Sequence, residues 1–144
     1  MTRDQRQGKR AHMLSIESFT PLIVFAALLL VLSLHGLAAS GQFPREHRKP
    51  ALASGLGPAF LYGSIFLAIV SLSVALLAAW RLIPWYAAII GGCLAILVAP
   101  LVLQQFPDRF IDGRASLLAF AGVGGLLALA LLWLAVSRGG LVLN

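Results

Sequence analysis

Four long apolar runs constrain this chain more than any other feature of its sequence. None of them contains Lys, Arg, Asp or Glu, and they cover Pro21–Ala39, Pro58–Trp80, Trp85–Leu103 and Ala115–Val136. A helix rises about 1.5 Å per residue, so a run of roughly 20 residues crosses a hydrocarbon layer about 30 Å thick. The sequence therefore predicts an all-α fold, an integral membrane four-helix bundle with antiparallel helical hairpins.

Composition favours a membrane bundle over a soluble one. Hydrophobic residues make up 60% of the chain and charged residues only 11%, whereas an average soluble domain is about 25% charged. Each helix of a soluble bundle would also carry a polar stripe, which these runs lack. No connecting segment is long enough to build its own core. We expect one transmembrane domain over residues 21–144, after a basic tail over residues 1–20 that is interfacial or disordered.

The tail and the first run also resemble a signal peptide in their order of residues. Basic residues come first, an apolar stretch follows, and the small residues of Leu37–Gly41 come last. The charged tail and the apolar run are both longer than is usual in signals, so we expect a retained anchor helix. It should begin near Pro21, because proline suits the first turn of a helix. Cleavage is the alternative, and it would leave three helices.

The connections between the runs predict the topology. Only Arg81-Leu82-Ile83 separate the second run from Pro84, where the third begins, so these two helices should be antiparallel. Four helices place both termini on one side, together with six of the basic residues, against five on the other side. The positive-inside rule then favours cytoplasmic termini. Abundant Ala, Leu and Gly, with Arg preferred to Lys, fits a multi-pass protein of a bacterial inner membrane.

Small residues in the last two runs predict close helix packing. Helices associate in lipid through close approach and hydrogen bonds, and glycine permits the closest approach. The candidate packing or partner-docking glycines are Gly91, Gly92, Gly122, Gly124 and Gly125. They serve either an internal four-helix core or contact with another subunit. Leucine in place of Gly125 is expected to disrupt assembly and to change migration on a native gel.

The link before the fourth run is the densest polar segment near the membrane. It contains Asp108, Arg109, Asp112 and Arg114. Asp112 is placed to cap the fourth helix, and Asp108 could pair with Arg109 or Arg114. A docking loop for a partner is the alternative. Asp112-Gly113-Arg114 is similar to the start of the CDP-alcohol phosphotransferase motif, but the spacing differs and no later acidic residue could complete a metal site.

His35 is the only histidine within an apolar run, and it is a weak functional candidate. A membrane histidine can ligate haem, relay protons or hold a quinone, or it can simply bond a carbonyl or a headgroup at the interface. Haem held between helices usually needs two histidines, and His12 and His47 lie outside the runs. Cys93 lies in an apolar setting that makes a poor nucleophile. We therefore expect no catalytic, cofactor-binding or metal-ligating residue.

These observations favour a protein that is not an enzyme. The basic residues lie outside the runs and do not alternate with aromatic residues, so a nucleic-acid partner is not expected. The expected partners are membrane lipids and other integral membrane subunits. We expect an accessory subunit or assembly factor of a larger membrane complex, such as a respiratory or photosynthetic one.

Two alternatives stay open. A small multi-pass transporter or permease is favoured by Pro100, by Gln104 and by the serines within the first two runs. A membrane enzyme that acts on lipid or quinone is favoured by His35.

Overall fold

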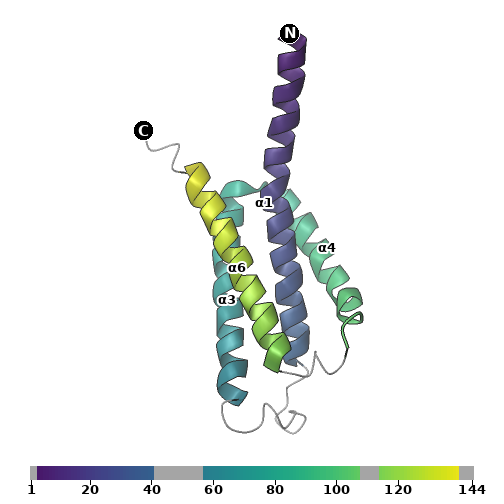
Figure 1. Cartoon of the computed structure of the whole chain (residues 1–144), viewed down its shortest axis with the longest axis vertical. Coiled ribbons are helices and arrows are strands. Elements are labelled where there is room, and N and C mark those ends of the chain that lie inside the picture. Colours follow the sequence, from purple (N-terminus) through teal and green to yellow (C-terminus); the bar gives the residue numbers. More distant parts are fainter. Residues whose placement is uncertain (1–2, 41–56, 108–113, 140–144) are drawn as a thin grey trace.

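The computed structural model describes residues 3–40, 57–107 and 114–139, with side chains for 19–40, 57–107 and 115–138. This part of the chain forms the helices α1 (Arg3–Ser40), α3 (Gly57–Leu82), α4 (Trp85–Leu103) and α6 (Arg114–Gly139), shown in Figure 1. The segments long and apolar enough to cross a membrane are Phe19–Ser40, Gly57–Leu82, Trp85–Leu103 and Ala115–Arg138. The prediction of an all-α, four-helix membrane bundle is confirmed.

Helix α1 begins much earlier than the sequence predicts. Pro21 lies inside α1 and does not start it. Proline removes one backbone hydrogen bond from a helix interior, but the residues before it are mostly strong helix formers such as Arg, Gln, Lys, Met and Leu. The helix therefore passes through Pro21, and its first half extends past the other helices (Figure 1). An interfacial position for this half stays a prediction.

The turn between α3 and α4 reverses the chain direction, as expected from its length. The Ile83 amide donates to the Ala79 carbonyl at 2.9 Å, and the Ala88 amide donates to the Pro84 carbonyl at 3.1 Å. Below this turn the two helices diverge, with α1 between them in Figure 1. A short link thus fixes opposite directions without bringing the two helices into extensive contact.

Helix α1 is the centre of the bundle. It packs extensively against α4 and α6 and less against α3, while α3 and α6 pack against each other. The topology makes α1 parallel to α4, and α3 parallel to α6. Helix α4 makes its extensive contacts with α1 alone. The outermost helix is therefore held on one side only.

The interior has two apolar clusters, one at each end of the bundle. The cluster near the α3–α4 turn consists of Phe25, Leu28, Ala75, Ala78, Ala79, Ile83, Ala128 and Leu131. The cluster at the opposite end consists of Leu34, Ala38, Ala39, Leu61, Ala99, Leu117 and Phe120. Alanine is frequent in both, which lets the helix backbones approach closely.

The outer surface is apolar along all four spans. Large side chains that would be unfavourable in water stand exposed on it, among them Phe66, Leu77, Leu97 and Leu126. Trp80, Trp85 and Tyr86 lie beside the α3–α4 turn, and the Trp85 and Tyr86 rings meet edge to face at 6.1 Å. Aromatic residues favour the boundary between lipid and water. The protein is a multi-pass membrane protein whose apolar surface contacts lipid.

Candidate functional site

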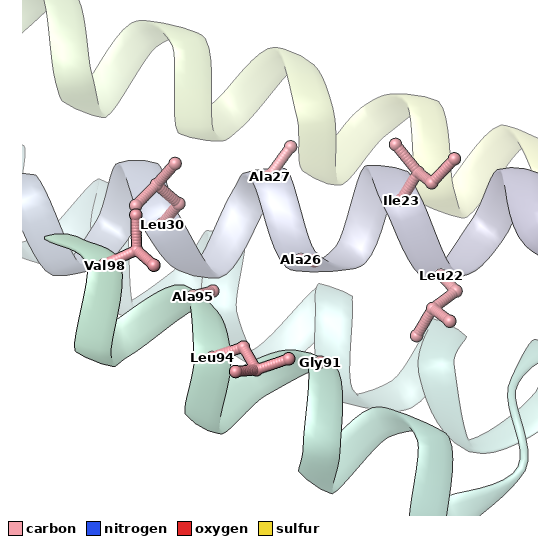
Figure 2. A pocket seen from close by; sticks show the side chains of 9 residues that line it. All are labelled: Leu22, Ile23, Ala26, Ala27, Leu30, Gly91, Leu94, Ala95 and Val98. Carbon is pink, nitrogen blue, oxygen red and sulfur yellow. The ribbon is translucent and has the colours of Figure 1, made fainter. Parts of the chain in front are cut away.

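An open apolar groove of about 470 Å³ lies between α1 and α4. Its lining side chains come from these two neighbouring helices and are shown in Figure 2. Those of α1 are Leu22, Ile23, Ala26, Ala27 and Leu30, and those of α4 are Gly91, Leu94, Ala95 and Val98. None of these side chains carries a hydrogen-bonding group. The groove can receive aliphatic side chains or acyl chains, and its lining residues offer no group for chemistry.

The glycines of α4 set how closely this helix approaches α1. A Cβ atom on Gly92 would lie 2.9 Å from Leu29 Cδ1, and one on Gly91 would lie 3.2 Å from Leu22 Cδ1. Both positions therefore receive a leucine from α1. A larger residue would require Leu29 to shift at Gly92, and Leu22 to move by a few tenths of an ångström at Gly91. Gly92 is buried beneath this contact, whereas Gly91 also lines the open groove.

The glycines of α6 face three different surroundings. Gly124 packs against Leu32 of α1, whose Cδ2 would lie 3.0 Å from an added Cβ. Gly125 faces α3, with Ser71 Oγ 3.9 Å from the same position. Gly122 is exposed and has nothing within 4 Å of an added Cβ. The five candidate glycines thus divide between internal contacts, the groove and the outer surface.

His35 is buried at the end of the bundle opposite the α3–α4 turn. The side chain is only 3% exposed. Its ring lies beside the backbone of Leu117 in the first turn of α6. Neither Nδ1 nor Nε2, however, makes a hydrogen bond with a residue that the structure describes. An imidazole inside a membrane span normally has a partner, so His35 is a second candidate site.

Most of the polar link before α6 lies outside the part of the chain that the structure describes. Asp108, Arg109 and Asp112 lie outside the described residues, and Arg114 is described only as the first residue of α6. The predicted cap and ion pair therefore stay predictions. Within the described residues, no three His, Cys, Asp or Glu side chains come together as a metal site would require.

Sequence reasoning missed the α1 side of the groove. Gly91 and its α4 neighbours stand out as small residues, but the receiving surface on α1 is formed by Ala26 and Ala27. The signal was present, because these are adjacent alanines between bulky residues of the first run. A pair of alanines does not by itself indicate which helix packs against it.

Function has to be inferred from these residues and contacts. No protein-family model, no curated protein and no solved structure matches this chain.

Proposed function

We propose that this protein is a non-catalytic accessory subunit or assembly factor of a larger membrane protein complex. The surface proposed to bind the partner is the groove between α1 and α4, together with the outer face of α4. The partner is another integral membrane subunit, which contributes a transmembrane helix.

The exposure of α4 is the observation that carries this proposal. Only 11% of the residues in its most apolar window are buried, against 33% in the windows of α1 and α6. Helix association in lipid depends on close van der Waals packing, for which small residues at the contact are favourable. Ala27 and Gly91 provide such a contact on the two sides of the groove. A partner helix could bury the side of α4 that this chain leaves uncovered.

Two serines of α3 support a role without chemistry. The Ser64 hydroxyl donates to the Leu61 carbonyl, and the Ser73 hydroxyl donates to the Ile69 carbonyl, each at 2.9 Å. These serines thus bond to their own helix, which weakens the argument for a polar transport path. Gln104 lies exposed beyond the end of α4.

Co-purification from native membranes tests the proposal. Tagged protein extracted in mild detergent should retain a membrane protein in fixed stoichiometry. Ala27→Phe fills the groove and should remove that protein. Ala130→Phe makes the same change on an exposed position of α6 away from the groove, and should retain it. A wild-type chain that purifies alone, or a partner equally retained by both variants, would contradict the proposal.

Photo-crosslinking gives an independent readout of the same surface. A photoreactive residue at Leu94, which lines the groove, should crosslink to the partner. The same residue at Leu126, exposed on α6, should not. Crosslinks of equal yield at both positions would contradict the proposal, because the partner would then not contact the groove in particular.

His35 supports one competing function, an enzyme that acts on lipid or quinone. The His35 imidazole is buried and has no hydrogen-bond partner among the described residues. A substrate carbonyl or hydroxyl could bond to such a group. This alternative predicts that His35→Ala abolishes turnover of such a substrate while the partner still co-purifies. The accessory-subunit proposal predicts that the wild-type protein does not turn over such a substrate.

A further inference from the structure

Two open grooves flank a single side chain at the α3–α4 turn. The indole of Trp80 is 87% exposed and borders both of them. The groove between α3 and α4 measures about 490 Å³ and is lined by Phe25, Leu76, Ala79, Trp80, Ile83, Pro84, Trp85, Ala88 and Ile89. The groove between α3 and α6 measures about 400 Å³ and is lined by Leu77, Ala78, Trp80, Arg81, Leu132, Ala135 and Val136.

Among the residues that line the two grooves, one is charged. Arg81, in the last turn of α3, borders the α3–α6 groove and is exposed. Trp80 precedes it in the chain, and Trp85 borders the other groove just beyond the turn. Tryptophan and arginine at the end of a span lie at headgroup depth, with the guanidinium reaching toward water. The grooves therefore run from the interface into the hydrocarbon region.

We propose that an anionic diacyl phospholipid binds across Trp80. One acyl chain lies in each groove, and the phosphate pairs with the Arg81 guanidinium. The two grooves are of similar size and share one wall, as two chains joined at a glycerol require. A guanidinium can bond two phosphate oxygens at once, which makes it a better phosphate partner than a point charge. This inference is independent of the proposed function.

Lipid titration of the full chain tests the headgroup. Delipidated protein in mild detergent is titrated with phosphatidylglycerol and phosphatidylcholine of identical acyl chains, and binding is read by native mass spectrometry. Phosphatidylglycerol should bind about fivefold more tightly. Arg81→Gln should abolish this preference, and Arg81→Lys should retain part of it. Arg114→Gln removes the same charge at the opposite end of the bundle and should leave the preference intact.

Two further comparisons test the grooves. Ala88→Phe and Ala135→Phe each fill one groove and should each weaken phosphatidylglycerol binding, while Ala130→Phe should not. Lyso-phosphatidylglycerol, with one chain, should bind more weakly than the diacyl lipid. Should a groove-filling variant fail to fold, the lyso-lipid comparison on the wild-type chain still decides whether two grooves are used.

Three results would overturn the proposal. Equal binding of the two headgroups by the wild-type chain would show that a net anionic lipid is not preferred. An unchanged preference in Arg81→Gln would leave Arg81 only the role of compensating the carbonyls at the end of α3. Equal binding of the one-chain and two-chain lipids would exclude a lipid that spans Trp80.

Discussion

At the scale of single residues, His35 stands apart because its ring is buried and has no hydrogen-bond partner among the described residues. A buried donor or acceptor that loses its hydrogen bond costs about 1–3 kcal/mol. Ser64 of α3 avoids this cost by donating to the Leu61 carbonyl. The His35 nitrogens have no such bond to a described residue. Among the described residues, His35 is therefore the buried polar side chain that carries this cost.

Replacing His35 with leucine should make the protein more stable. Leucine has a similar size and no polar atom, so the variant loses the unsatisfied nitrogens and keeps the packing. We expect the free energy of unfolding to rise by about 1 kcal/mol. Tryptophan fluorescence during thermal unfolding in mild detergent would measure it, since Trp80, Trp85 and Trp133 all lie within the described helices.

The neighbouring Leu34 provides the sensitivity control. It is buried at 4% exposure, and Leu34→Ala should lower stability by about 2–5 kcal/mol because it leaves a cavity. If His35→Leu also lowers stability, the imidazole has a partner in the bilayer. That result would strengthen the case for a ligand at His35.

At the scale of helices, the sequence predicts which segments span the membrane but not which helices pack against one another. A span needs only sufficient length and an absence of charge, both of which can be read from the sequence. The predicted start of α1 near Pro21 was wrong, because proline in the first turn of a helix and proline inside a continuous helix have similar local sequences. The short α3–α4 link constrains direction only. The preference of α4 for α1 depends on contacts remote in sequence.

Leucines of α1 explain which helices meet. Leu29 packs over Gly92 of α4, and Leu32 packs over Gly124 of α6. Sequence analysis identified the glycines as sites of close approach, which these contacts explain. It did not identify the leucines, because α1 is rich in leucine and nothing local distinguishes those that face a glycine. Such pairing becomes visible only in three dimensions.

Two leucine substitutions in α6 should separate internal packing from outer-surface contact. Leucine at Gly125 must fit between α6 and α3, where Ser71 Oγ and Leu67 Cδ1 already lie within about 4 Å of the added Cβ. We expect a loss of about 1–3 kcal/mol from overpacking and altered migration on a native gel. Alanine at Gly125 fits at ordinary contact distance and should be tolerated.

Gly122→Leu is the matched control on the same helix. Its added side chain points into open surroundings, so the stability of the isolated bundle should not change. Altered stability in Gly122→Leu, together with none in Gly125→Leu, would contradict the described packing of α6. A loss of partner binding in Gly122→Leu alone would instead place a docking contact on α6.

At the scale of the whole molecule, charge distribution decides how the bundle lies across the membrane. Arg81 and Arg138 end α3 and α6 on the side of the termini, and four more basic residues precede the first span. The opposite side has five basic residues, four in the links between helices and Arg114 at the start of α6. The difference is small, but the residues before the first span usually dominate orientation. We therefore predict cytoplasmic termini.

Cysteine labelling in sealed cells would test this orientation, because the sequence contains a single cysteine. Cys93 is exposed on α4 and is first replaced by serine. Ser137→Cys then reports on the terminal side and Gln105→Cys on the opposite side, and both positions are exposed. A membrane-impermeant maleimide should label Gln105→Cys in intact cells and Ser137→Cys only after permeabilisation. The reverse pattern would place Arg81, and the phospholipid proposed to bind it, in the outer leaflet.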